Sequence, residues 1–305
     1  MELYWAGRDI TPYVNITGCI HRDVSHGRSD SLELTLDHAS TWYKWGPEED
    51  DEIRVVHNED DTGVMYLNTV IPTGDRFRVL ATSLPRAAAR KAWGSYRNTT
   101  LEKMFETCGA ECRMGGKLYG IDGKLEYPFL LRENEGCAAF LNRIGSWEGV
   151  AVKALNGAFR GIGILYAQER KAEMEITIRA NQEGVTYKRR DNTKFTGLTV
   201  KTPWATATAR DTAAKGSNAP ILAHLPAMSS TEAGRWALGL LLMHNRAAEE
   251  ITLEIKLNTR LAAMTRVDID GNTDMNGRWI VDTAEHDLHN KTTSVRLLRV
   301  IDTIL

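Results

Sequence analysis

The sequence has no apolar run that approaches the 18 or more residues of a membrane-spanning helix. Its N-terminus, MELYWAGRDITPY, has neither a basic start nor an apolar stretch, so no signal peptide is visible. The net charge is only −2, which gives no overall attraction to nucleic acid or anionic lipid. These absences predict a protein that is made in the cytosol and stays there, or leaves by lysis or inside a larger assembly.

Cysteine is also scarce. The four cysteines form no C-x-x-C pair, and no matching His or Cys pair follows Cys108 and Cys112, which lie four positions apart. Gly109 is predicted to end the helix between them. Because a structural zinc site needs four closely spaced ligands, buried thiols are the better interpretation, and no metal is expected. The four are Cys19, Cys108, Cys112 and Cys137.

Signatures of catalysis are missing. There is no G-x-S-x-G elbow, no H-E-x-x-H and no Walker loop. Gly161 and Gly163 stand close together, but no helix is expected to follow them, so a phosphate-binding loop is not supported. Cys137 is predicted on an apolar helix face, where a thiol is a poor nucleophile. We therefore expect no catalytic residue, no cofactor and no enzymatic activity.

The segment EHDLH near the C-terminus brings several titratable side chains together. His286 and His289 lie three positions apart and would point to opposite faces of a strand, which does not suit a shared metal ion. Asp282, Glu285 and Asp287 could supply acid–base carboxylates, as any acidic cluster could. Nothing in the sequence marks one of them as perturbed.

The segment VDIDGNTDMNGRWIV suggests a calcium loop at first sight, since oxygen-bearing side chains fall at every second position. A helix–loop–helix calcium site also needs Gly at its sixth position and Glu at its twelfth. Thr273 and Trp279 occupy these places, and both flanks have the pattern of strands. A polar loop between two strands is therefore predicted. The four oxygen-bearing residues are Asp268, Asp270, Asn272 and Asp274.

Positive charge gathers in two places only. One is the run Lys188-Arg189-Arg190, and the other is the segment with Arg86, Arg90, Lys91 and Arg97. A solvated face is the favoured interpretation of both. The alternative is a local contact with an acidic partner protein or with DNA that passes through a channel.

With 305 residues and 42% hydrophobic content, the chain suits a globular protein of two or three domains. Residues 1–85 are predicted as strands. SDSLELTLDH alternates strictly, and an acidic turn that ends at Gly63 separates two further strands. At least four short strands at this spacing indicate a small sandwich or barrel.

Residues 86–185 are predicted as a mixed α+β domain. TTLEKMFETCG and NEGCAAFLNRIGSWEG each have one apolar helical face. VAVKALNGAFRGIGIL follows as a hairpin, because Asn156-Gly157 suits a type I′ turn.

Residues 186–305 are again rich in predicted strands, with a polar loop over 205–220. The longest helix is expected near 230–248, with Ser229 and Glu232 at the spacing of a capping box and His244 on its buried stripe. The alternating strand ITLEIKLN, a hairpin and a last strand, TTSVRLLRVIDTIL, complete this block.

Several of these segments together resemble the phage late control D and baseplate hub proteins. The opening LYWAGRDITPYVNITGCIHRDVSHGRSDSLELTLDH is similar to the first domain of that family, and the two-helix region with its NG hairpin is similar to the family's middle. The tail, LLLMHNRAAEEITLEIKLN and then GRWIVDTAEHDLHNKTTSVRLLRV, resembles the closing domain. The matching positions are Gly277, Trp279, Ile280 and His286.

The resemblance implies a mainly β, α+β fold with two tail-tube-like antiparallel β-barrel domains and a mixed helical insert. It corresponds to the hub part of VgrG-like proteins, without the spike. It implies a homotrimeric ring that joins the sixfold tail tube to the threefold central spike in the baseplate of a virion or tail-like contractile particle, assembled in the bacterial cytoplasm. Implied partners are the tail tube or tube-initiator protein and the spike, with the tape measure and baseplate wedge proteins as further candidates. Neither a membrane span nor sequence-specific nucleic-acid binding is expected.

Two other functions remain open from the residues alone. A cell-wall lytic enzyme of the same particle would need a carboxylate pair or a Cys–His site. A soluble carbohydrate- or peptide-binding β-protein is permitted by the eight tryptophans, although Trp147 and Trp236 have the positions of helix packing residues.

Overall fold

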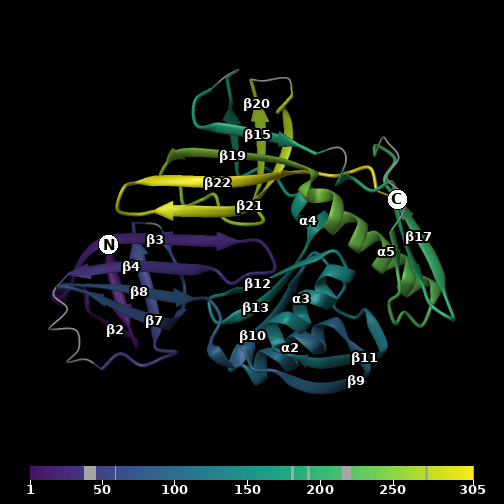
Figure 1. Ribbon diagram of the computed structural model, residues 1–305, viewed down its shortest axis with the longest axis horizontal. Coiled ribbons are helices and arrows are strands. Elements are labelled where there is room, and N and C mark those ends of the chain that lie inside the picture. Colours follow the sequence, from purple (N-terminus) through teal and green to yellow (C-terminus); the bar gives the residue numbers. More distant parts are fainter. Residues whose placement is uncertain are drawn as a thin grey trace.

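The computed structural model describes residues 1–37, 46–58, 60–179, 182–190, 193–214, 221–271 and 274–304. Strands dominate, and the helices gather beside one long sheet (Figure 1). The prediction of a mainly β chain of the α+β class is confirmed.

The N-terminal block is built from short antiparallel strands around one apolar core. Leu32, Leu34 and Leu36 are almost completely buried, as the alternation of their strand predicts. The elements are β1 (Glu2–Trp5), β2 (Arg8–Asp9), the 3-10 turn η1 (Thr11–Tyr13), β3 (Asn15–Val24), β4 (Ser31–Asp37), β5 (Glu52–His57), β6 (Asp60–Asp61), β7 (Met65–Thr73) and β8 (Arg76–Thr82).

The middle block combines the two predicted helices, α2 (Leu101–Glu111) and α3 (Cys137–Trp147), with short strands and a third helix, α4 (Ile164–Glu169). Asn156 and Gly157 both have positive φ, so the expected turn joins two of these strands. The other elements are η3 (Arg86–Ala89), β9 (Ala92–Thr100), β10 (Gly115–Tyr119), β11 (Glu126–Glu135), β12 (Val150–Leu155), β13 (Ala158–Gly163) and β14 (Met174–Thr177).

Two helix predictions in the middle block were wrong in detail. Gly109 does not end α2 but lies buried inside it, where an added Cβ would come within 2.7 Å of the carbonyl oxygen of Gly115. This glycine is therefore there for close packing rather than for a helix stop. A helix also begins directly after Gly163, although none was expected. It is only six residues long, and its first N–H already donates to the carbonyl of Gly149, so no anion site results.

The C-terminal block contains the longest helix, α5, which Ser229 caps by accepting a hydrogen bond from the backbone N–H of Glu232. The predicted loop over 205–220 contains a strand, β17, because a short turn lets Thr206–Arg210 pair with the preceding strand; residues 215–220 lie outside the described residues. The elements are β15 (Val185–Arg189), β16 (Gly197–Lys201), β17 (Thr206–Arg210), β18 (Ile221–Ala223), α5 (Ser230–Asn245), η5 (Arg246–Ala248), β19 (Glu249–Lys256), β20 (Arg266–Asp270), β21 (Gly277–Asp287) and β22 (Thr292–Arg299).

One apolar core joins the helices of the middle block to α5 and the sheet of β16, β17 and β18. The rings of Trp147 and Trp236 pack with their centroids 4.7 Å apart. Gly239 lets α5 approach the end of α3, since an added Cβ there would come within 2.2 Å of the carbonyl oxygen of Trp147. Both tryptophans are therefore packing residues, as expected.

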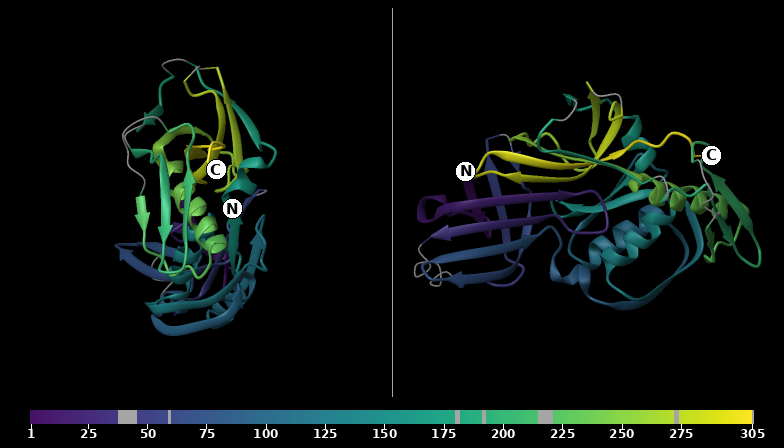
Figure 2. Two further views of the ribbon diagram at one scale, coloured as in Figure 1. Left: turned by 90° about the vertical axis from the view of Figure 1, so that its right-hand side faces the viewer. Right: turned by 45° about the horizontal axis from the view of Figure 1, so that its top comes forward.

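Strands from the two ends of the chain form a single antiparallel path in the order β15-β19-β22-β21-β3-β4-β8-β7-β5-β1-β2. Figure 2 shows β3 and β4 running beside β21 and β22. The junction of β3 with β21 was not expected from the sequence. The pairing among the described strands is open at both ends, so closure of either block into a barrel stays a prediction.

Candidate functional site

The two end blocks are joined by a strand pair, which we call the seam: Ile20–Val24 of β3 against Thr283–Asp287 of β21. β21 pairs with β22 along one edge. Its other edge pairs first with β20, through residues 277–280, and then with β3. The register shift at Asp282 separates these two halves. A bulge of this kind bends a strand, and here it lets one strand serve both blocks.

Charged groups hold the bulge. The Asp282 carboxylate accepts hydrogen bonds from Arg246 at 2.9 Å and from Arg296 at 2.8 Å. Ser25, on the loop after β3, donates to it through its hydroxyl at 2.6 Å, and the Ser25 N–H donates to the Asp282 carbonyl. Asp282 is therefore engaged from three directions, which fixes the seam and leaves no free carboxylate for acid–base chemistry.

A buried ion cluster lies where all three blocks meet. Lys153 of β12 is only 3% exposed and reaches between the carboxylates of Asp23 and Asp30. Asp23 also accepts the N–H of Ala263 at 2.8 Å, and Asp30 accepts the N–H of Val24 at 2.9 Å. One ammonium group thus joins the middle block to β3 and to the residue before β4, and Asp23 links this pair to the loop before β20.

Burial and mutual attraction set the protonation of this cluster. Burial alone would lower the pKa of Lys153, but the two carboxylates raise it above its ordinary value. Burial would raise the pKa of Asp23, but Lys153 lowers it below its ordinary value. For Asp30 burial prevails and raises the pKa to about 7. The pair Lys153–Asp23 is therefore ionised at neutral pH.

Two histidines face each other across the seam. His21 pairs in register with His286, and their ring centroids lie 6.1 Å apart. His286 shares a hydrogen bond of 3.0 Å with Thr293, whereas both ring nitrogens of His21 are buried without a described partner. Burial lowers the pKa of His21 to about 4 and lowers that of His286 as well. Both rings are neutral at physiological pH.

The remaining candidates from the sequence do not converge on one site. His289 is exposed in the turn after β21, whereas His286 is buried within that strand. Glu285 forms an ion pair with Arg22, and Asp287 accepts backbone hydrogen bonds from its own turn. The prediction that His244 lies on the buried stripe of α5 was wrong. It is exposed beside Phe195, because the helix buries the neighbouring Asn245 instead.

The predicted polar loop lies between β20 and β21. Asp268 pairs with Arg266, and Asp270 accepts the N–H of Gly271. Asn272 and Thr273 lie outside the described residues. Among the described residues, no group of three His, Cys, Asp or Glu side chains is placed to hold a metal ion. All four cysteines are buried thiols.

Each basic cluster is partly paired within the chain, while Arg90, Lys91 and Arg97 are exposed. Lys188 and Arg190 form ion pairs with Glu250, and Arg86 with Glu49. No described helix has the length and apolar character needed to cross a membrane.

The long sheet ends in strand edges that no described strand covers. β7 pairs with β8 along its whole length, but β5 and the residues before it reach only as far as Leu67 on the opposite edge. Residues 68–73 therefore present an open edge. β15 likewise pairs only with β19 among the described strands. Open edges of this kind are templates for pairing with another chain.

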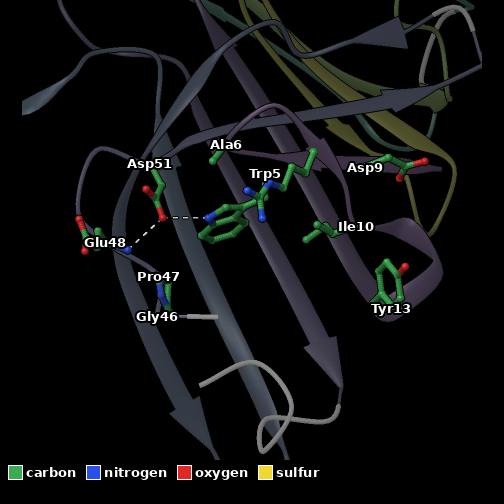
Figure 3. A pocket seen from close by; sticks show the side chains of 10 residues that line it. Trp5, Ala6, Asp9, Ile10, Tyr13, Gly46, Pro47, Glu48 and Asp51 are labelled. Atoms are coloured by element: carbon green, nitrogen blue, oxygen red, sulfur yellow. Dashed lines mark hydrogen bonds between the residues drawn. The ribbon is translucent and has the colours of Figure 1, made fainter. Parts of the chain in front are cut away.

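A pocket of about 650 Å³ lies at the other end of the path, beside β2 (Figure 3). The indole N–H of Trp5 donates to the Asp51 carboxylate at 2.9 Å, which also accepts the N–H of Glu48. Asp9 accepts the N–H of Thr11, and its hydrogen bonds to Thr11 lower its pKa. The carboxylates of Asp51 and Asp9 thus stabilise local turns and are not paired as an acid and a base would be.

The fold can be compared with known proteins at this point. No protein-family model and no curated protein sequence matches the chain. Solved structures do match. A tail protein from Neisseria meningitidis MC58 superposes with a TM-score of 0.75 and 9% identity, over 98% of this chain and 95% of that one. The 43 kDa tail protein of prophage MuSo2 from Shewanella oneidensis gives 0.70 and 12%, over 98% and 96%.

The chain has the fold of phage tail proteins. A component of the Escherichia coli type VI secretion system, itself described as similar to T4 bacteriophage tail proteins, gives a TM-score of 0.62 and 9% identity, over 99% of this chain and 78% of that one. Proteins of phage tails and of a secretion system therefore share this fold, and the similarity covers nearly the whole chain.

The sequence did not reveal the seam, the ion cluster or the open edges. One signal was present for Lys153, which is the only charged residue in the otherwise apolar stretch VAVKAL. A lysine inside a strand that is apolar on both faces must find a carboxylate in the interior. The partner strand of β3 has no comparable local signal.

Proposed function

We propose that the chain is a structural baseplate hub protein of a phage tail or tail-like contractile particle. Three copies form a ring that joins the sixfold tail tube to the threefold central spike. The observation that carries this proposal is the long antiparallel sheet, which crosses from one end block to the other and leaves an open edge on β7 and on β15. The fold that the chain shares with tail proteins supports it.

The direction of the strands suits such a ring. From β15 to β7 the path holds eight strands, and every neighbouring pair is antiparallel. Because the number is even, β15 of one copy and β7 of the next run in opposite directions when the copies follow one another. The junction between copies then repeats the antiparallel pairing of the seam, and a closed ring leaves no edge uncovered.

The outward face of this sheet would line the channel of the ring. Its charged side chains are paired across the strands: Arg22 with Glu285, Glu33 with Arg78, and Asp37 with Arg76. The opposite face carries the apolar core of the N-terminal block and a second apolar core formed by β19, β20, β21 and β22. A charge-balanced lining neither attracts nor repels a polyelectrolyte strongly. The hub requires no turnover, and its partners are the tube or tube-initiator protein and the spike.

Light scattering on the purified chain tests the ring. We expect a molar mass of about 100 kDa, three times the 34.1 kDa of one chain, as a closed symmetric trimer requires. Ile71→Lys places a charge on the open edge of β7 and should give monomers. Leu165→Lys on α4 is the matched control, since Leu165 is similarly exposed but lies away from both edges.

A monomer at every concentration, or an equal loss of mass in both variants, would contradict the ring. Incubation of the pure chain with bacterial cell walls separates the hub from a lytic enzyme. We expect the turbidity of the walls to stay constant, and clearing would favour the enzyme.

A further inference from the structure

The small sheet β17-β16-β18 has one face that nothing in the described part of the chain covers. Its inner face packs against α5 through apolar side chains such as Leu198 and Val200. The outer face carries Thr199, Lys201, Thr208, Arg210 and Leu222. This sheet forms the right-hand end of the molecule in Figure 1, whereas β7 lies at the lower left and β15 near the top. The face is therefore separate from the edges that would join copies.

This face is cationic and almost free of acids. Between Lys194 and Thr231 the sequence contains one carboxylate, Asp211. That carboxylate is buried and accepts hydrogen bonds from Asn245 and Thr303. Lys201 and Arg210 are exposed and have no ion-pair partner among the described residues. They contrast with the arginines on the long sheet, which are paired across strands.

Large apolar groups accompany these charges. Trp204, in the turn between β16 and β17, is 68% exposed, and Leu222 of β18 is 51% exposed. The turn is fixed, because the Thr202 hydroxyl accepts the N–H of Trp204 at 3.1 Å and that of Ala205 at 2.8 Å. Trp204 is thus held out on a rigid turn, which lowers the entropic cost of binding.

We propose that the outer face of β17-β16-β18 docks an acidic segment of a second protein. Trp204 and Leu222 supply the apolar contact, and Lys201 and Arg210 pair with carboxylates on the partner. Tryptophan and arginine are the residues that most often dominate the binding energy of protein interfaces. Nucleic acid fits less well, since two cations neutralise too few phosphates for binding at physiological salt.

Fluorescence anisotropy of labelled probes on the full chain tests the proposal. The probes are a short peptide in which Glu and Leu alternate, the same peptide with Gln for Glu, and a single-stranded oligodeoxynucleotide. We expect only the acidic peptide to bind. Trp204→Ser, and separately Lys201→Gln with Arg210→Gln, should each weaken binding about tenfold or more, as loss of a dominant interface residue does.

Matched controls lie on another sheet. Trp93 of β9 is 71% exposed, and Lys91 and Arg97 are exposed cations near it. Trp93→Ser, and Lys91→Gln with Arg97→Gln, should leave peptide binding unchanged. Lys201→Glu with Arg210→Glu should transfer the preference to a peptide in which Lys replaces Glu, a gain that misfolding cannot mimic.

Failure of the acidic peptide to bind, or equal effects at Trp93 and Trp204, would overturn the proposal. Tighter binding of the oligonucleotide that is lost with Lys201→Gln and Arg210→Gln would also overturn it and identify a nucleic-acid surface instead. The molar mass of the chain is independent of these outcomes, so the ring and the docking face can fail separately.

Discussion

Replacement of Lys153 by methionine should destabilise the protein strongly at neutral and alkaline pH. The side chain is 3% exposed and lies between two carboxylates that are themselves buried. Methionine fills similar space but leaves Asp23 without its cation. Breaking a buried ion pair by removing one partner typically costs about 3–5 kcal/mol of the free energy of unfolding.

The pH dependence of this loss distinguishes an ionic from a packing role. In the native protein the pKa of Asp23 is lowered, so the carboxylate adds stability above its unfolded pKa and loses it as the pH falls through the lower, folded pKa. Without Lys153, burial raises the pKa of Asp23 above the unfolded value. The variant is then least stable at high pH and recovers as acid protonates Asp23 and Asp30.

Urea unfolding followed by circular dichroism at pH 5 and pH 8 measures both effects. Lys103→Met is the matched control, because the Lys103–Glu106 pair on α2 is exposed and contributes about 1 kcal/mol at most. Lys153→Met combined with Asp23→Asn should recover part of the stability at pH 8. A loss of stability that is below about 1 kcal/mol for Lys153→Met, or that is equal at both pH values, would refute the ionic role.

Three further predictions follow from single features. The pKa of His21 is about 4 in the folded chain against 6.5 in the unfolded chain, so only the unfolded state takes up a proton as the pH falls from 6.5 to 4. The free energy of unfolding should fall by up to about 3 kcal/mol over this range. The difference in unfolding free energy between the native protein and His21→Leu measures this loss, and a difference that stays constant with pH would contradict it. Gly239→Ala should lower the free energy of unfolding by about 2 kcal/mol or more, because the added Cβ meets backbone atoms at the end of α3. Gly234→Ala in the same helix is the control. Its Cβ meets nothing closer than 3.9 Å, and it should raise the free energy of unfolding by a few tenths to about 1 kcal/mol in thermal unfolding. The four thiols should react with a thiol reagent only after denaturation, since all are buried. Rapid labelling of the folded chain would contradict this and show that the N-terminal core around Cys19 or the middle block around the other three opens.

Local signals predicted much of the fold. The alternation of ITLEIKLN gave β19, and the serine cap with its apolar stripe gave α5. The positive φ of Asn156 and Gly157 explains why the NG turn could be recognised. Each of these signals lies within about ten residues of sequence, where side-chain period and turn chemistry are sufficient.

Features that depend on distant partners could not be predicted in this way. Local patterns indicate where strands lie, but they carry no information about which strand pairs with which. At Gly163, directly before α4, the chain passes close to the Gly120 carbonyl, which an added Cβ would meet at 2.5 Å, so this glycine depends on a distant neighbour. The prediction for His244 was wrong because helical periodicity considers only apolar side chains. In the structure Asn245 is buried instead, since its side-chain amide donates hydrogen bonds to the Phe195 carbonyl and to Asp211.

The seam also has a consequence for how the chain folds. Arg22 and Glu285 meet across 263 positions of sequence, so the N-terminal strands remain incomplete until β21 docks. Proteins dominated by such distant contacts fold slowly. Before β3 has paired, the hairpin of β21 and β22 from a neighbouring copy can pair with it through the same residues as the chain's own hairpin. Exchange of this hairpin would keep every strand contact and interlock the copies. The slowest folding step and the step that binds copies together would then be the same event.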